Sequence, residues 1–164
     1  MNFLKSILIV IAAQLVTSDG IGQKLNYDLG NQIFVEMQIP SGWELYHTTA
    51  TAVTYNAPLS EVKVAIELAA VDKQKSSEIL NRLFKKEGYK CARNEEHTET
   101  VNHVEIAKRD CMTTGWFDTR HTWYVFKAGP AQKALVIRVL YVKDTPGVVK
   151  KVDTFLRSIN FSKK

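Results

Sequence analysis

The sequence lacks the short motifs that identify most nucleotide-binding and hydrolytic enzymes. It contains no P-loop, no G-x-G-x-x-G fingerprint, no H-E-x-x-H zinc motif and no G-x-S-x-G nucleophile elbow. It also contains no internal repeat, no low-complexity tract and no linker. The absence of these motifs favours a non-catalytic protein over an enzyme and gives no support to a cofactor. The absence of a repeat or linker indicates a single domain.

The apolar run near the start of the chain is too short for a membrane-spanning helix, which needs about 20 residues. Residues 7–16 form this run behind a single positive charge, and small residues follow it. That order is typical of a secretory signal peptide. We predict that residues 1–22 are the signal, cleaved after Ser18 or Gly22. Residues 23–164 are then a single exported domain, periplasmic or extracellular, without a transmembrane segment. The alternative, a buried N-terminal helix, lacks capping residues at either end.

Acidic residues are in the minority. The chain has 22 Lys and Arg against 17 Asp and Glu, a net charge of +5. Such a balance favours anionic partners. The basic residues nevertheless occur in short groups, at residues 85–90, 150–151 and 163–164, and no basic run reaches five residues. A solvated basic surface is therefore a better explanation than a dedicated binding stripe, and we expect no nucleic-acid partner.

Alternation of apolar and polar residues predicts most of the strands. In residues 31–39, Ile33, Val35 and Met37 face one way, while the residues between them face the other. Pro40 ends this strand. Similar alternation, or a short apolar run, predicts the other strands: residues 51–55, 62–70, 89–97, 103–113, 121–127 and 133–142.

The apolar period changes to that of a helix in two places. Residues 75–87 repeat apolar side chains at helical spacing, and Gly88 follows where a helix C-cap needs a positive φ. Residues 145–159 form the second helix, in which Thr145 can cap the N-terminus and Pro146 suits the first turn.

Consecutive strands joined by short turns predict a mostly antiparallel sheet. Residues 123–126 and 135–137 are apolar on both alternating faces, which is typical of strands covered on both sides. The sequence therefore predicts an α+β fold, with a central sheet of about six to seven strands sandwiched by two main helices.

The element order and one short motif resemble a known superfamily. The opening strand ends in Ile-Pro-Ser-Gly-Trp at residues 39–43, and the closing helix runs into Arg-Ser-Ile-Asn-Phe at residues 157–161. Over residues 30–161 this pattern is similar to the PsbP-like α/β sandwich superfamily, which includes photosystem extrinsic proteins and bacterial envelope proteins of the DcrB type. The resemblance implies a non-enzymatic accessory or binding role, and it supplies no shared catalytic residues.

The chain has two cysteines, Cys91 and Cys111, which export would place in an oxidising compartment. They are equally distant from residue 101, in the turn of the predicted hairpin. Symmetric pairing would set them directly opposite each other, within disulfide range. A bridge closing a loop of about 20 residues would stabilise the fold by roughly 3 kcal/mol. We favour this disulfide over the alternative, a nucleophilic cysteine beside a histidine.

The same hairpin carries side chains of metal-ligand type, His97, Glu99 and His103. Imidazoles and carboxylates suit a divalent ion. The two histidines are six residues apart, however, which matches no standard zinc spacing. A turn also needs polar residues simply to be solvated, so metal binding is the weaker of the two hypotheses.

Residues 115–121, Gly-Trp-Phe-Asp-Thr-Arg-His, connect two predicted strands and are the most suggestive surface segment. Trp and Arg are enriched among residues that dominate binding energy, which makes Trp116, Phe117 and Arg120 candidate binding residues. The alternative is that Trp116 and Phe117 cap one end of the core.

Arg138 interrupts an apolar strand, and an unpaired buried charge is very costly. It must pair with a carboxylate, of which Glu67 and Asp118 are possible, or open onto a groove. A structural ion pair is the favoured explanation. The polar floor of a ligand groove is the alternative, and it makes Arg138 a further candidate binding residue.

Two classes of function remain. The favoured one is an exported binding or accessory protein that recognises another envelope protein or a small ligand. The alternative is a small exported hydrolase, metal-dependent or histidine-based, using the His97 and His103 turn or His121. A convergent pocket holding a histidine and a carboxylate would favour this enzyme.

Overall fold

The computed structural model describes residues 22–71, 73–114, 118–142 and 144–163. Ten strands, two α-helices and one short 3₁₀ turn, η1 (Pro58–Ser60), make up this part of the chain. No helix in the described ranges is long and apolar enough to cross a membrane. The predicted signal peptide lies almost entirely outside the described residues.

Seven strands form one antiparallel sheet, in agreement with the predicted six to seven, although the strand predicted over residues 31–39 belongs to a second sheet. The two edges of the seven-stranded sheet are formed by the third and the sixth strand of the chain. In spatial order the strands are β3 (Glu44–Thr48), β4 (Ala52–Asn56), β5 (Val62–Ala70), β9 (Lys133–Tyr141), β8 (Thr119–Ala128), β7 (Val104–Thr113) and β6 (Arg93–Val101).

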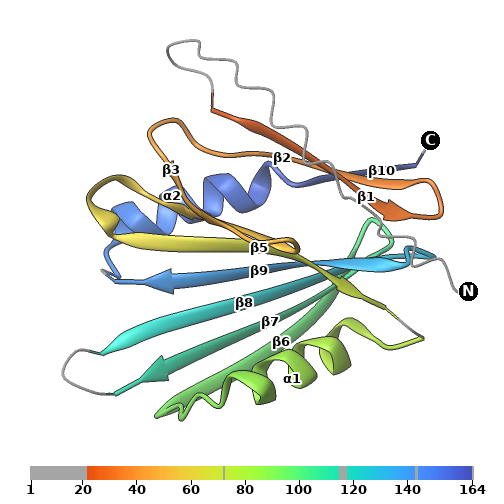
Figure 1. Cartoon of the computed structure of the whole chain (residues 1–164). Helices are drawn as coiled ribbons and strands as arrows, with labels where there is room; N and C mark the ends of the chain where they lie inside the picture. The colour runs from red at the N-terminus through yellow and green to blue at the C-terminus, as the bar shows by residue number, and fades with distance from the viewer. Residues whose placement is uncertain (1–21, 72, 115–117, 143, 164) are drawn as a thin grey trace, which may run out of the picture.

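The two faces of this sheet have different covers (Figure 1). Helix α1 (Ser76–Glu87) packs on one face, mainly against β7 and β8. The opposite face carries α2 (Pro146–Arg157) and a second, three-stranded antiparallel sheet. That smaller sheet consists of β1 (Lys24–Gly30), β2 (Ile33–Gln38) and β10 (Asn160–Lys163). The predicted α+β sandwich is therefore confirmed.

The apolar residues of β8 and β9 fill both layers of the core. Val136 belongs to the cluster under α1, whereas its neighbour Ile137 belongs to the cluster under α2, and both are fully buried. Trp123 packs edge-on against Phe84 of α1, with ring centroids 5.9 Å apart. Continuous apolar runs thus fold as the strands that are covered on both sides.

Both helices begin where the sequence predicts, and α1 also ends as predicted, whereas α2 ends at Arg157, two residues before its predicted end. The backbone N–H of Lys75 donates to Glu78 Oε2 at 2.8 Å, and Gly88 closes α1 with a φ of 70°. Val148 N donates to Thr145 Oγ1 at 3.4 Å at the start of α2. A left-handed residue after the last turn is accessible to glycine because it has no Cβ.

The structure also corrects several predicted boundaries. Three strands, β1, β3 and β10, were not expected. The strand predicted over residues 89–97 runs instead from Arg93 to Val101, because a two-residue turn at Asn102 and His103 fixes the hairpin. Both turn residues have positive φ, 49° and 64°, as a tight hairpin turn requires.

Candidate binding surface

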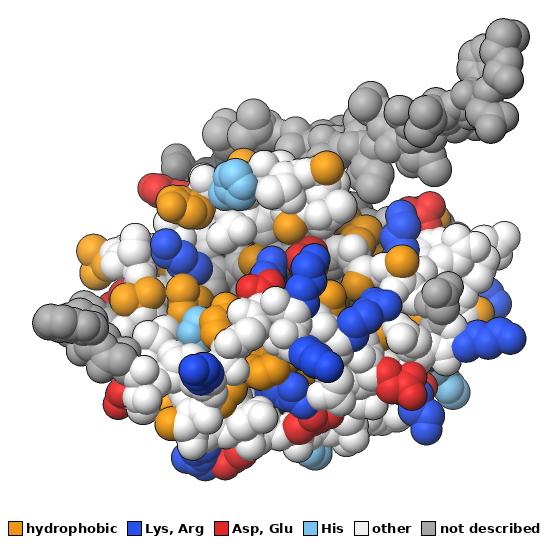
Figure 2. Space-filling model, turned by 60° about the horizontal axis from the view of Figure 1, so that its bottom comes forward, with side chains coloured by type: hydrophobic (Ala, Val, Ile, Leu, Met, Phe, Trp, Pro, Cys, Tyr) orange, Lys and Arg blue, Asp and Glu red, His pale blue; other side chains and the backbone are white. Residues whose placement is uncertain are grey.

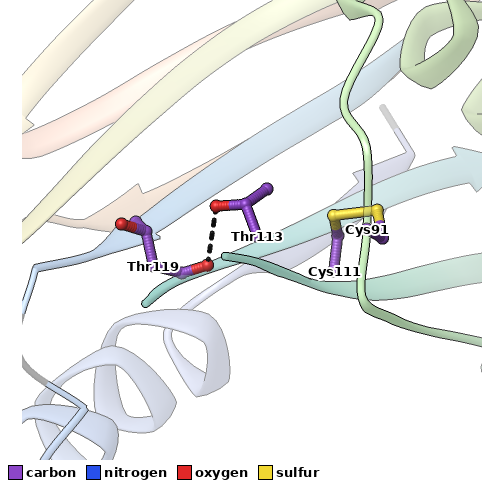
Figure 3. Close-up of a disulfide and its surroundings, with 4 residues drawn as sticks. All are labelled: Cys91, Cys111, Thr113 and Thr119. Atoms are coloured by element: carbon purple, nitrogen blue, oxygen red, sulfur yellow. Dashed lines mark hydrogen bonds between the residues drawn. A yellow bond between two sulfur atoms is a disulfide. The ribbon is translucent and has the colours of Figure 1, made fainter. Parts of the chain in front are cut away.

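Cys91 and Cys111 form the expected disulfide, with Cα atoms 5.3 Å apart (Figure 3). The predicted reason was wrong, since the residue opposite Cys111 is Asn94. The hairpin is centred between Asn102 and His103 rather than on residue 101, so Cys91 precedes β6 and reaches back to the strand. Cys111 is fully buried in the cluster under α1. The bridge therefore ties the segment after α1 to the sheet.

A charged cleft lies at the end of the sheet where β7 ends and β8 begins. It has a volume of about 250 Å³, and we call it the Arg120 cleft. Arg120 was expected in the loop between the strands, but β8 starts at Thr119, so Arg120 lies within the strand. The cleft is lined by Arg93, Glu95, Asp110, Cys111, Met112, Arg120 and Asp144.

Arg120 bridges two carboxylates in this cleft. Its Nε and Nη2 donate to Asp110 Oδ1, both at 3.2 Å, and its Nη1 donates to the Asp144 oxygens at 3.3 Å. Thr122 Oγ1 donates to Asp110 at 2.5 Å, and Lys108 Nζ lies 2.8 Å from the other Asp110 oxygen. The charges are thus balanced and held in place by neighbouring strands.

The pKa shifts in the cleft follow from this network. Burial alone would raise the pKa of Asp110, but hydrogen bonds from Lys108 and Thr122 and the charges of Lys108 and Arg120 hold it below its ordinary value. Burial lowers the pKa of Arg120, and the charges of Asp110 and Asp144 more than restore it. Burial raises the pKa of Tyr141, whose ring lies 4.9 Å from the Arg120 guanidinium, to about 12. The cleft therefore holds fixed ion pairs at neutral pH, and the neutral side chain of Tyr141 is buried against Arg120 outside the cleft lining.

Arg138 is paired within the sheet. Its Nη2 donates to Glu67 at 3.0 Å and its Nη1 to Glu87 of α1 at 3.1 Å, while Asp118 is not a partner. The guanidinium also lies 5.2 Å from the centre of the Trp123 ring. These contacts make Arg138 a clamp between α1 and the sheet.

The candidate metal ligands lie on the edge strand β6, beyond its cleft residues Arg93 and Glu95, and in the turn that follows it. His97 and Glu99 occupy the exposed strand β6, and His103 is in the turn that follows. Within the described ranges, no three His, Cys, Asp or Glu side chains gather closely enough to hold a metal ion. Metal binding at these residues therefore stays a hypothesis, and no cluster of ligands among the described residues supports it.

Trp116 and Phe117, the aromatic candidates, lie outside the described residues. The strand ends beside them are joined where Thr113 Oγ1 donates to the Thr119 carbonyl oxygen at 3.2 Å (Figure 3). These strand ends lie beside the Arg120 cleft, because Met112 pairs with Arg120 there.

Three apolar side chains at this end of the sheet were not foreseen. Leu59, Leu45 and Val142 are 86%, 58% and 54% exposed, and we call them the apolar rim. The topology places all three at the same end of the sheet (Figure 1). Leu45 is near the start of β3, which lies beside the end of β4, and Leu59 is in η1, which follows β4. Val142 follows β9, and its N–H donates to the Glu61 carbonyl oxygen at 2.9 Å. A sequence signal for this rim was Leu59, because an apolar residue between Pro58 and Ser60 in a turn indicates an exposed apolar side chain.

The basic residues do not form a stripe on the face that carries α1. Figure 2 shows Lys and Arg side chains scattered over this face, interspersed with acidic and apolar ones. This pattern agrees with the solvated basic surface that the short groups of lysines predicted.

Taken together, two helices on opposite faces of a seven-stranded antiparallel sheet and an added three-stranded sheet define the class: the chain has the PsbP-like α+β fold. Its particular neighbours include the solution structure of cyanobacterial PsbP (CyanoP) from Synechocystis sp. PCC 6803. That structure matches with a TM-score of 0.61 and 12% identity, over 90% of this chain and 97% of that one.

Two further solved structures have the same fold. LpqN of Mycobacterium tuberculosis, described as involved in cell envelope biogenesis, has a TM-score of 0.57 at 8% identity, over 85% of this chain and 91% of that one. The Saccharomyces cerevisiae Ran-binding protein Mog1p has a TM-score of 0.53 at 11% identity, over 85% and 95%. Identities this low establish the fold alone. No protein-family profile and no curated protein matches the sequence.

Proposed function

We propose that this chain is an exported, non-catalytic binding protein that recognises another protein through the apolar rim and the adjoining Arg120 cleft. The observation that carries this proposal is the exposure of Leu59, Leu45 and Val142 together at one end of a rigid sheet. Exposed apolar groups beside fixed charges are typical of protein-recognition surfaces.

The chemistry of the cleft also supports recognition rather than catalysis. Arg120 is saturated by Asp110 and Asp144, so it has no free charge to polarise a substrate. Fixed ion pairs at the margin of an apolar patch are suited to setting the orientation of a partner. Two proteins with this fold carry compatible descriptions, one as Ran-binding and one as involved in cell envelope biogenesis.

Export is part of the proposal. The fold begins directly after the predicted signal: Ile39 N donates to the Gln23 carbonyl oxygen at 2.7 Å, and β1 starts at Lys24. Cleavage after Ser18 or Gly22 would therefore leave every strand intact. A disulfide between the only two cysteines fits an oxidising compartment. N-terminal sequencing of the purified protein should give Asp19 or Gln23, and an intact Met1 would contradict export.

The binding proposal is tested by comparing what the protein captures from envelope extracts of its own cells. Leu59→Ser combined with Val142→Ser removes most of the apolar rim without touching the core, so the fold should stay intact and the partner should be lost. Val101→Ser is the matched control, because Val101 is 45% exposed at the opposite end of the sheet. If the wild type, the Leu59→Ser and Val142→Ser double variant and Val101→Ser all retain the partner equally, the proposed surface is wrong.

A further inference from the structure

The two edges of the seven-stranded sheet differ in how they are protected from pairing with another chain. Edge strands are commonly blunted by being short or by carrying a bulge. Strand β3 has both features, since it spans five residues and its register shifts between Leu45 and His47. Strand β6 has neither. It pairs with β7 in an unbroken register over nine residues, and all nine side chains are exposed.

The outward-facing backbone groups of β6 can be assigned from the hairpin turn. A two-residue turn makes Val101 and Val104 a hydrogen-bonded pair, so odd-numbered residues of β6 bond to β7. The N–H and C=O groups of the even-numbered residues therefore point away from the sheet. Among the described strands, only β7 pairs with β6, which leaves this row of groups available. The residues concerned are Asn94, Glu96, Thr98 and Thr100.

We propose that β6 pairs antiparallel with β6 of a second copy of this chain, joining the two sheets into one. The symmetry axis would pass through Glu96, whose outward N–H and C=O would bond to those of Glu96 in the second copy. Charge complementarity argues for this occupant. In this register Arg93 lies opposite Glu99 of the second copy, and Glu95 lies opposite His97 of the second copy. Symmetry repeats each pair.

The side chains of each such pair lie on the same face. Odd-numbered residues of β6 share the α2 side of the sheet with the even-numbered residues of β7, and directly opposed residues in a sheet point to the same side. The two Glu96 carboxylates would meet on the α1 side. Each is already neutralised by Arg109 of its own copy.

Neighbouring registers are less favourable. Centring the pairing on His97 sets Glu95 opposite Glu99 of the second copy, and like charges directly opposite each other are destabilising. Centring it on Thr98 places Arg93 beyond the end of the opposing strand. Of these three registers, only the Glu96-centred one sets Arg93 opposite an acidic residue of the second copy. A pairing centred on Asn94 would set Arg93 opposite Glu95 of the second copy, but it would overlap only residues 93–95 of β6.

Sedimentation velocity of the purified protein over a wide concentration range tests this proposal. The wild type should dimerise, and Thr98→Pro should be monomeric, with the wild-type melting curve at protein concentrations where the wild type is itself monomeric. Proline there removes an outward N–H, a position that an edge strand tolerates. Thr98→Ala is the matched control and should still dimerise. A monomeric wild type, or a dimer that survives Thr98→Pro, would overturn the proposal.

Charge reversal tests the register and does not depend on the fold tolerating proline. Arg93→Glu should weaken dimerisation by about tenfold or more, since both symmetry-related pairs become repulsive. Adding Glu99→Arg to Arg93→Glu should restore the wild-type dissociation constant. If the double variant stays as weak as Arg93→Glu alone, the Glu96-centred register is wrong. The apolar rim lies outside β6, so loss of the captured partner in the Leu59→Ser and Val142→Ser variant would leave dimerisation unchanged. Arg93 also lines the Arg120 cleft, so Thr98→Pro, which lies outside the cleft, is the variant that separates the two proposals.

Discussion

Arg138 of β9 donates from Nη2 to Glu67 Oε2 of β5 at 3.0 Å, although the residue directly opposite Arg138 is Ala65. The pair is therefore diagonal across the two strands. The diagonal reach leaves the second guanidinium nitrogen free to meet Glu87 at the end of α1, 3.1 Å away. One arginine thereby joins β9, β5 and the helix, over the face of Trp123.

Replacing Arg138 should destabilise the protein more than replacing an exposed partner of an ion pair. We expect Arg138→Met to lower the free energy of unfolding by about 1–3 kcal/mol, because two partly buried carboxylates lose a charged hydrogen-bond donor. Lys24→Met removes the exposed pair with Glu36 and should cost about 0–1 kcal/mol. Urea unfolding monitored by tryptophan fluorescence measures both. Equal losses would contradict the clamp.

The Cys91–Cys111 bridge should contribute measurably to stability. It joins residues 20 positions apart, for which loop closure corresponds to roughly 3 kcal/mol. We expect the double variant Cys91→Ala with Cys111→Ala to lose about 2–4 kcal/mol in urea unfolding. A reductant should destabilise the wild type by a similar amount and leave the double variant unchanged. A wild type with two measured free thiols and an unaltered melting temperature would refute this.

The elements best predicted from the sequence are those whose residue pattern is dictated by burial. Strand β5 matches its predicted range of residues 62–70, and β9 differs from its prediction by one residue. Strand β9 is largely apolar because layers on both of its faces exclude water, whereas β5 alternates because only the face toward α2 is fully buried. The start of α2 and the end of α1 were predictable for a local reason, since capping depends on Thr145 and Gly88.

The missed features depend on tertiary contacts that leave no local pattern. All five residues of β3 and all nine of β6 are exposed, so neither strand shows an apolar period. The partners of Arg120 could not be predicted either. Asp110 lies two residues before Met112, which is directly opposite Arg120, so Asp110 reaches Arg120 diagonally. Asp144 lies near Arg120 because Tyr141, at the end of β9, pairs with Arg120 of β8. Register sets these contacts, and the turn at Asn102 and His103 sets the register of the hairpin.

Acidification should destabilise the protein in two separate pH ranges. Burial lowers the pKa of His121, whose ring lies 4.5 Å from that of Tyr89. Folding therefore disfavours protonated His121, and stability should fall as the pH drops below about 6.5, the ordinary value for histidine. The pKa of Asp110 is also lowered, so its contribution is present above about pH 4 and is lost as the pH falls through its folded pKa.

Single variants separate these two ranges. In urea unfolding at a series of pH values, His121→Phe should flatten the dependence between neutral and mildly acidic pH and leave the acidic range unchanged. Asp110→Asn should do the reverse. Each variant is the control for the other. A His121→Phe protein with the wild-type slope below neutral pH would contradict the assignment to His121.

The apolar rim predicts a conflict between stability and binding at Leu59. This residue has a φ of 61°, a left-handed conformation that costs a residue with a Cβ about 1–2 kcal/mol, and its side chain is 86% exposed. Leu59→Gly should therefore stabilise the fold by about 0.5–1 kcal/mol, after allowing for the greater entropy of unfolded glycine. Leu59→Ala removes the same apolar surface but keeps the Cβ, so it should give no such gain. Both variants should lose the captured partner if the rim binds it. Thermal unfolding and capture measured on the same samples check the two effects together, and a Leu59→Gly protein that binds as well as the wild type would remove Leu59 from the binding surface.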